Sequence, residues 1–199
     1  MAKLRKSPRP EKQLLWIWLQ RDMKKLSGSV GLDLAGGEMS NYDLFRADQY
    51  ICADIDEERM IQGLAKVPDA KLIHSSLENF DSREIQGDII VCVQTIGINN
   101  LFDAENTMIV VEKIIEATKP NGSAIFNIGS NSISYLPSIL NLIEKKFESV
   151  TIKSYGNIFF NLQYPKVISL LLAIIMFFLP VFLRGKNKRY IVCKRKMFS

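Results

Sequence analysis

Two patterns of apolar residues alternate along this chain of 199 residues: short continuous runs, and residues at helical spacing. Short apolar runs bounded by turn-forming residues are typical of buried strands. They predict strands at residues 29–34, 49–54, 70–75, 87–94, 123–129, 148–156 and 188–195. Between them, apolar residues at helical spacing predict helices at 38–46, 56–66, 104–118 and 132–147, the last with an irregularity before Pro137. The alternation predicts an α/β fold with a doubly wound, mainly parallel sheet of seven strands and helices on both faces.

The segment that precedes this alternation is residues 1–27. A basic arm is followed by "EKQLLWIWLQRDMKKL", residues 11–26, in which Leu14 and Trp18 share one face of a helix. Two interpretations stay open. The helix either lies in a membrane interface, with tryptophans at headgroup depth, or packs against the domain.

A long apolar run, "VISLLLAIIMFFLPVFL" at residues 167–183, interrupts the pattern between the last two strands. As a helix at 1.5 Å per residue it would reach about 25 Å, less than the roughly 30 Å of a bilayer core. Pro180 would also kink it. We therefore divide the chain into residues 1–27, a domain of 28–156 with 188–199, and an apolar insert of 157–187.

The formal net charge of +5 is concentrated at the two ends, in "MAKLRKSPRPEK" and "RGKNKRYIVCKRK". Basic ends suit anionic lipid headgroups or nucleic acid, or are simply solvated. No platform of aromatic and basic residues accompanies them, which disfavours nucleic acid. Cys52, Cys92 and Cys193 lie in apolar runs without metal-ligand spacing, so we expect buried reduced thiols and no metal site.

The loop "GLDLAGGEMSNY", residues 31–42, follows the first strand, where doubly wound sheets bind ligands. Gly36 and Gly37 allow a sharp turn and close approach of a ligand. The G-x-G-x-x-G spacing of dinucleotide sites is absent, and Glu38 stands where a phosphate would lie. A positively charged cofactor without phosphate fits better. Asp54 ends the second strand, where a carboxylate accepts hydrogen bonds from ribose hydroxyls, and Asp56 is placed to cap the next helix.

These motifs, with "GDIIVCVQTIGI" at the fourth strand and "TKPNG" before the fifth, resemble the class I S-adenosylmethionine-dependent methyltransferases. The resemblance covers residues 28–156 and 188–195. Ala35 and Met39 replace two glycines of the family's loop, so Met39 must adopt an ordinary helical φ. Where the family often has an acid after the third strand, this chain has "SSL" at residues 75–77.

The resemblance implies that S-adenosylmethionine is the cofactor. It places the cofactor contacts at Asp33, Ala35, Gly36, Gly37, Asp54, Ile55, Ser76, Leu77 and Gln94. Candidates for the methyl-transfer side are Gln94, Thr95, Asn99 and Asp103, with Asn100, Asn127 and Tyr135 as weaker ones. His74, the only histidine, is interpreted as a polar strand-end residue rather than a base.

In the family, the last two strands pair antiparallel, which would bring both ends of the insert together. The insert would then leave and re-enter at the rim of the site. We expect a monotopic or re-entrant element at the cytoplasmic face, touching membrane through residues 158–184 and through the 11–26 helix. A lid over an apolar substrate and a dimer contact are the alternatives.

Two hypotheses of function follow. One is an S-adenosylmethionine-dependent methyltransferase that acts at the cytoplasmic membrane face on a lipid or a lipid-linked glycan. The other is a non-catalytic scaffold of the same fold that docks membrane or a partner enzyme. Cofactor binding separates them, while the sequence fixes neither the acceptor nor the oligomeric state.

Overall fold

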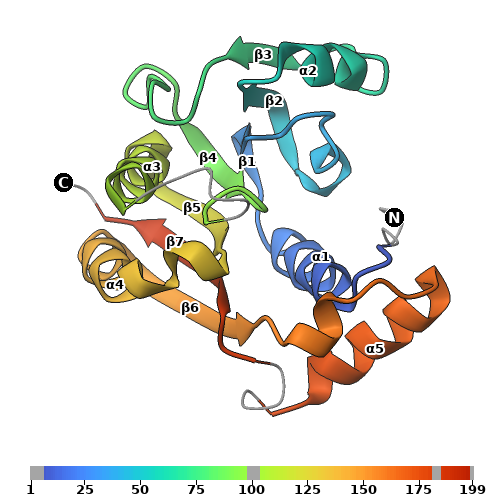
Figure 1. The fold of residues 1–199 in the computed structure, drawn as a ribbon. Helices are drawn as coiled ribbons and strands as arrows, with labels where there is room; N and C mark the ends of the chain where they lie inside the picture. Colours follow the sequence, from blue (N-terminus) through green and yellow to red (C-terminus); the bar gives the residue numbers. More distant parts are fainter. Residues whose placement is uncertain (1–6, 98–103, 181–184, 198–199) are drawn as a thin grey trace.

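A computed structural model describes residues 7–97, 104–180 and 185–197. Its centre is a seven-stranded sheet in the order β3-β2-β1-β4-β5-β7-β6 (Figure 1). The strands are β1 (Gly28–Leu34), β2 (Ala47–Asp54), β3 (Lys71–His74), β4 (Gly87–Cys92), β5 (Thr118–Ile128), β6 (Phe147–Tyr155) and β7 (Lys188–Lys196). The pairs of β1 to β5 are parallel, and β7 runs antiparallel between β5 and β6. The predicted sheet is confirmed, and its order reverses between β1 and β4.

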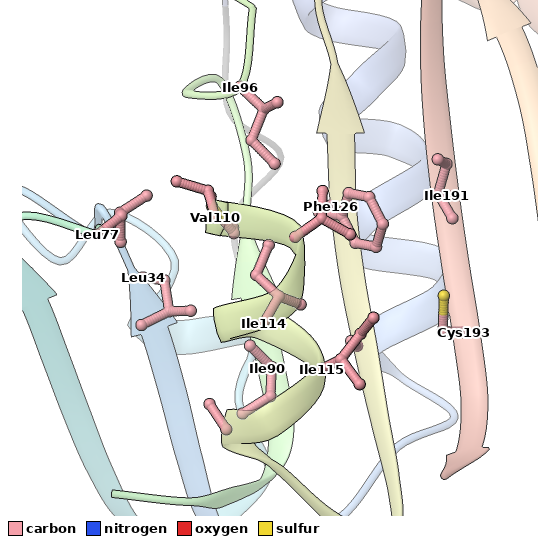
Figure 2. Packing of buried hydrophobic residues seen from close by; sticks show 14 of the residues in the cluster. Leu34, Leu77, Ile90, Ile96, Val110, Ile114, Ile115, Phe126, Ile191 and Cys193 are labelled. Carbon is pink, nitrogen blue, oxygen red and sulfur yellow. The ribbon is translucent and has the colours of Figure 1, made fainter. Parts of the chain in front are cut away.

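Helices cover both faces of this sheet. The α-helices are α1 (Pro10–Met23), α2 (Glu57–Leu64), α3 (Ala104–Ala117), α4 (Leu136–Glu144) and α5 (Lys166–Phe178). Short 3₁₀ helices are η1 (Tyr42–Leu44), η2 (Ser130–Tyr135) and η3 (Ile158–Asn161). Helices α3 and α4 pack on one face through Ile114 and Ile139. Figure 2 shows Ile114 of α3 among other residues of this cluster. Helix α1 packs on the other face, and α5 packs beside α1.

Burial on both faces explains the near-continuous apolar runs of the central strands. In β4, Ile90 and Cys92 meet the cluster under α3, while Ile89 and Val91 meet the cluster under α1. The helix boundaries follow local chemistry too. Asp56 caps α2 by accepting a hydrogen bond from the Arg59 amide, as predicted. The irregularity expected before Pro137 is the 3₁₀ helix η2.

The helix predicted at residues 38–46 is wrong. The segment contains only the single turn η1. Gly37 and Met39 have φ angles of 48° and 53°, which an α-helix cannot include. The expectation of an ordinary helical φ for Met39 is therefore also wrong. Its side chain is buried with Tyr50 and Met60, and this packing holds a backbone conformation that methionine rarely adopts.

Helix α1 packs on the domain, which is one of the two interpretations of the 11–26 segment. Leu14, Leu15, Trp18 and Leu19 are all buried. The insert between β6 and β7 contains η3 and α5. Because Tyr155 of β6 pairs with Lys188 of β7, the chain leaves and re-enters the sheet at one point. Among the described residues, no helix is both long and apolar enough to cross a bilayer.

Candidate functional site

The carboxyl edge is the edge of the sheet at which the parallel strands end. It places Asp33 of β1, Asp54 of β2, Gln94 after β4 and Asn127 of β5 near the point where the strand order reverses. Crevices at such switch points bind ligands in open α/β sheets. The sequence predicted this grouping, because residues at the ends of neighbouring parallel strands share one edge.

The β1–β2 loop turns sharply away from the end of β1. The amides of Ala35 and Gly36 both donate to the carbonyl of Ala53, at 2.7 and 3.3 Å. A Cβ atom on Gly36 would lie 2.8 Å from the Cys52 Sγ atom and 3.0 Å from the Asp33 Cγ atom. Position 36 therefore requires glycine because the loop lies directly on the sheet, and Ala35 adopts a φ of 56° to bring it there.

The carboxylate of Asp54 joins the two loops that leave β1 and β2. Its Oδ2 atom accepts from the Gly37 amide at 2.8 Å, and its Oδ1 atom accepts from the Asp56 amide at 2.9 Å. Each carboxylate oxygen has more than one acceptor site. The group is thus held in place by the backbone and keeps capacity for hydroxyl donors of a ligand.

Asp33 lies beneath the same loop and is fully buried. Its carboxylate accepts from the Tyr50 hydroxyl at 2.8 Å and from the Asn41 side-chain amide at 3.0 Å. It therefore ties the middle of the β1–β2 loop to β1 and β2, and its predicted cofactor contact stays a prediction. Tyr50 and Asn41 were not among the predicted site residues. Their signal is faint, since Tyr50 lay in a predicted strand and Asn41 in the helix wrongly predicted at residues 38–46.

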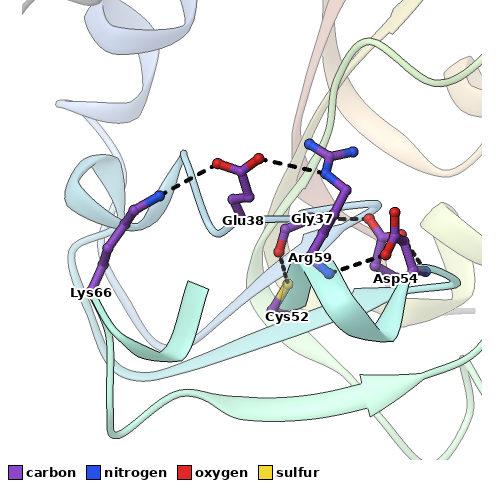
Figure 3. A network of polar contacts seen from close by, with 7 residues as sticks. Gly37, Glu38, Cys52, Asp54, Arg59 and Lys66 are labelled. Atoms are coloured by element: carbon purple, nitrogen blue, oxygen red, sulfur yellow. Dashed lines mark hydrogen bonds and ion pairs between the residues drawn. The ribbon is translucent and has the colours of Figure 1, made fainter. Parts of the chain in front are cut away.

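Glu38 points toward α2 and not into the turn. Its carboxylate pairs with Arg59 Nε at 3.7 Å and with Lys66 Nζ at 3.5 Å (Figure 3). The Cys52 thiol also contacts the Gly37 carbonyl oxygen at 3.8 Å. The ion pairs are exposed and weak individually, so they orient the loop more than they stabilise it. They also explain how an acid is accommodated in a loop of this kind.

One apolar side chain is exposed directly beyond Asp54. Ile55 follows directly, and its side chain is 67% exposed, which is unusual for a residue so close to a buried strand. Leu77 is buried and Ser76 is half-buried in the loop after β3. The His74 ring nitrogen Nε2 contacts the Ile55 carbonyl at 3.0 Å, so His74 serves as a polar strand-end residue, as interpreted.

The opposite side of the edge is formed by the loop after β4. Gln94 has a φ of 65°, and its amide donates to the side-chain oxygen of Asn127. The Thr95 hydroxyl donates to the Val93 carbonyl at 3.4 Å, and Tyr135 ends η2. Asn127 therefore fixes the backbone at the start of this loop. The candidates Asn99, Asn100 and Asp103 lie outside the described residues.

The three cysteines are buried thiols. Burial raises the pKa of Cys52 and of Cys92 far above the usual range, and it raises the pKa of Cys193 to about 12. Such thiols are poor nucleophiles at neutral pH, because the thiolate is the reactive form. Within the described ranges, no group of His, Cys, Asp and Glu side chains could hold a metal ion.

A pocket of ≈ 370 Å³ lies elsewhere, between the loop after β3 and the second half of α3. Glu116 is one of its lining residues, and its backbone carbonyl accepts from Gln86 and Lys196 near the start of β5. The pocket is thus at the amino edge of the sheet. Its distance from the strand ends separates it from the candidate site.

The arrangement is the fold of the class I S-adenosylmethionine-dependent methyltransferases. The N-methyltransferase NodS from Bradyrhizobium japonicum WM9, solved with S-adenosylhomocysteine, superposes with a TM-score of 0.62 at 8% identity over 94% of this chain and 87% of NodS. An rRNA methylase from Streptococcus thermophilus gives a TM-score of 0.59 at 12% identity, over 97% of this chain and 99% of the methylase. The plantazolicin methyltransferase BpumL, solved with a triazolic desmethylPZN analog and S-adenosylhomocysteine, gives a TM-score of 0.60 at 14% identity, over 92% of this chain and 84% of BpumL. No protein-family model and no curated protein matches the sequence.

Proposed function

We propose that the protein is an S-adenosylmethionine-dependent methyltransferase. The observation that carries this proposal is the Asp54 carboxylate, which two backbone amides hold at the switch point of a methyltransferase fold. Solved structures with this fold, NodS and BpumL among them, contain S-adenosylhomocysteine. The alternative of a non-catalytic scaffold requires that this preformed site bind nothing.

The residues at the carboxyl edge fit such a cofactor. Asp54 would accept hydrogen bonds from the ribose hydroxyls. Ile55 and Leu77 would cover the adenine, which accounts for the large exposed fraction of an apolar side chain at position 55. Gly36 and Gly37 let the loop pack closely on β1, β2 and Arg59, which fixes its backbone beside the place proposed for the cofactor.

When bound, S-adenosylmethionine supplies a methyl group that is already activated by the adjacent sulfonium. The remaining task of the protein is alignment of the acceptor, because proximity and orientation supply much of the rate. The backbone at Gln94 and its support by Asn127 suit that task, since neither moves without breaking their partly buried hydrogen bond. Thr95 adjoins this segment as a further polar group.

Helix α5 suggests where the acceptor is found. One face of α5 forms an apolar stripe of exposed side chains, namely Val167, Ile168, Leu171, Ile174, Ile175 and Phe178. These positions recur at helical spacing, and the opposite face packs on α1 through Ala173 and Met176. Residues 157–187 contain no Asp or Glu, while Lys166, Arg184 and Lys186 add positive charge.

An exposed apolar stripe with basic flanks and no acid suits the interface of an anionic bilayer. The insert that carries this stripe leaves the sheet at the end of β6, at the carboxyl edge. We therefore assign the acceptor to lipids or lipid-linked glycans at the cytoplasmic face of a membrane. Basic residues on both flanks of the insert agree with that face.

The methyltransferase proposal is tested by calorimetric titration with S-adenosylmethionine and S-adenosylhomocysteine. We expect saturable binding that Asp54→Ala weakens about a hundredfold, because a charged acceptor of buried hydrogen bonds is lost. Asp48→Ala, on the exposed start of the same strand, is the matched control and should bind normally. A folded wild type that binds neither compound would leave only the scaffold alternative.

The membrane assignment is tested by co-sedimentation with vesicles. Wild type should bind phosphatidylglycerol vesicles more strongly than phosphatidylcholine vesicles, and salt should weaken binding. Leu171→Asp with Phe178→Asp should abolish binding, because two charges would enter the apolar stripe. Ile61→Asp, at an apolar residue of α2 that is 56% exposed, is the control. Equal binding by the stripe variant and wild type would refute the assignment.

A further inference from the structure

Arg189, the second residue of β7, is a half-buried cation that pairs with no carboxylate of the described residues. Every other arginine in the described ranges is exposed. The Nη1 atom of Arg189 donates to the backbone carbonyls of Lys186 and Lys188, the second at 3.1 Å. On the same strand, the exposed Arg195 pairs with Glu148 at 3.5 Å. Of the described arginines, Arg189 is therefore the one for which a missing counter-charge costs most.

The guanidinium of Arg189 has lost hydration without gaining an opposite charge. Moving a charge away from water is unfavourable unless an ion pair and hydrogen bonds compensate it. Burial accordingly lowers the pKa of Arg189 from its usual value. Both carbonyls bind Nη1, so they leave the donors of Nε and Nη2 for another group. A guanidinium presents such donors as a planar fork that fits the oxygens of a phosphate or a carboxylate.

The side chain of Arg189 lies at the carboxyl edge of the sheet. It leaves β7 on the face covered by α3 and α4, because side chains alternate along a strand and Ile191 and Cys193 join the cluster on that face (Figure 2). Strand β7 runs antiparallel to β5, so its first residues lie where the parallel strands end. Lys186 precedes β7, and its carbonyl accepts from the guanidinium. The guanidinium therefore extends past the end of the strand, where the insert returns to the sheet.

Arg189 is also close to the methyl-transfer side of this edge. It lies opposite Ile128 in the sheet, and the next residue, Tyr190, lies opposite Asn127. The Asn127 side chain accepts from the amide of Gln94, at the start of the loop after β4. Neighbouring strands are about 4.8 Å apart, so β7 and β4, which flank β5, are about 10 Å apart. A group bound to the arginine needs to cross only one strand to reach Gln94.

Charges divide the carboxyl edge into two halves. The half formed by β1, β2 and the start of α2, where the cofactor is proposed, is acidic and contains Asp33, Asp54, Asp56, Glu57 and Glu58. From residue 118 to the end of the sequence, the only two acids are Glu144 and Glu148. Both lie at the amino edge, at the end of α4 and the start of β6. The half formed by β5, β6 and β7 thus contributes no acid of its own to the carboxyl edge.

Two acids approach this second half from α1, and both are already paired. Glu11 pairs with Lys188, and Asp22 pairs with Lys153 at 2.6 Å. Each pair is neutral, so the charge of Arg189 stays uncompensated. Complementary charges set orientation and partner choice in recognition. A cationic cofactor matches the acidic half, and an anionic acceptor matches the half that contains Arg189.

We propose that Arg189 binds a phosphate group of the acceptor, and that the acceptor is a phosphate-bearing lipid. Phosphate is the oxyanion that links headgroup and chain in most membrane lipids, which matches the membrane assignment above. With its phosphate on Arg189, the headgroup extends across β5 toward Gln94. This inference rests on the proposed function and narrows its acceptor class. A soluble phosphate ester is the other source of the same chemistry, and the test distinguishes the two.

The test compares three soluble amphiphiles with the same chain: octyl phosphate, octyl glucoside and octyltrimethylammonium, each titrated calorimetrically below its micellar concentration. We expect wild type to bind octyl phosphate about tenfold more tightly than the other two, the value of a charge-assisted hydrogen bond. Equal binding of all three, or binding of none, would overturn the proposal. Inorganic phosphate should bind more weakly than octyl phosphate, because it lacks the apolar chain. Equal binding of these two would assign the site to a soluble phosphate compound and overturn the lipid source.

Variants locate the phosphate. Arg189→Gln and Arg189→Met remove the charge at similar side-chain length, and each should lose the preference for octyl phosphate over octyl glucoside. Arg195→Gln is the matched control, because it removes the same charge from the other end of β7 and should keep the preference. Thermal unfolding identifies the folded variants. A preference that persists without Arg189, or that Arg195→Gln removes equally, would overturn the assignment.

Titration with S-adenosylhomocysteine separates this inference from the proposed function. Wild type and both Arg189 variants should bind S-adenosylhomocysteine equally, because Arg189 belongs to the other half of the edge. A wild type that binds S-adenosylhomocysteine but does not prefer octyl phosphate would overturn this inference alone. A wild type that does not bind S-adenosylhomocysteine would overturn the proposed function, and with it the role of Arg189 in binding an acceptor.

Discussion

Two regions of the carboxyl edge bury polar groups in opposite ways. In the β1–β2 region, Asp33 and Asp54 each accept two hydrogen bonds from the protein itself. In the α1 region, where α1 packs on β5, β7 and α5, Glu11, Gln13 and Asn127 each leave one buried atom without a partner. The first region has its shape fixed by its own hydrogen bonds. The second keeps hydrogen-bonding capacity that the chain does not use.

The largest effect is expected from a substitution that disrupts the β1–β2 region. Gly36→Ala should lower the free energy of unfolding by about 3 kcal/mol, because its Cβ would overlap Cys52 and Asp33, which cannot both move. Urea denaturation measures this change, and titration with S-adenosylhomocysteine should show weaker binding in parallel. Ala35→Gly is the matched control and should be neutral or stabilising, since Ala35 already has a positive φ. A Gly36→Ala protein as stable as wild type would contradict the tight contact of loop and sheet.

A smaller change removes one anchor of the same loop. Tyr50→Phe deletes the 2.8 Å hydrogen bond to the buried Asp33 carboxylate and should cost about 2 kcal/mol. Chemical denaturation measures the loss. The control from the α1 region is Ser169→Ala, which removes a buried hydroxyl without a partner and should stabilise the fold by about 0.5 to 1 kcal/mol. If both substitutions changed the free energy of unfolding in the same direction, the contrast between the two regions would be contradicted.

The third prediction concerns alkaline pH. Burial raises the pKa of Cys193 from 9.0 to about 12, so the folded state keeps a proton that the unfolded state releases. The stabilisation is complete below about pH 9 and is lost as pH rises from there toward the folded value, at about 1.4 kcal/mol per pH unit. Cys193→Ala should therefore reduce the slope of stability against pH between about pH 9 and 11 by that amount. Urea denaturation under reducing conditions measures it. Identical slopes would show that the thiol titrates normally.

The central strands were predictable because they are buried on both faces and their apolar runs are nearly unbroken. The positions of Asp54, Gly36 and Gly37 at the carboxyl edge were predictable because they lie at or just after the ends of β2 and β1. Met39 was not, since only the buried cluster it joins holds its positive φ. No local pattern in the sequence encodes such a conformation.

The buried polar residues of α1 were missed for a different reason. Helical spacing placed Leu14 and Trp18 on one face of a helix, but it gave no indication that Glu11 and Gln13 are buried. Their burial depends on α5 and β7, which lie far away in the sequence. A signal existed, since Glu11 lies one turn before the buried Leu14 and Leu15 on the same helix.

The point at which the insert leaves and re-enters the sheet has an evolutionary consequence. Tyr155 pairs with Lys188, and Gly156 and Gly185 lie in such close backbone contact that a Cβ on Gly185 would come within 2.6 Å of Gly156. The hairpin is thus closed before the insert begins. Doubling the length of a closed loop costs only about 0.6 kcal/mol. Residues 157–187 can therefore change in length during evolution without rebuilding the sheet from which they depart.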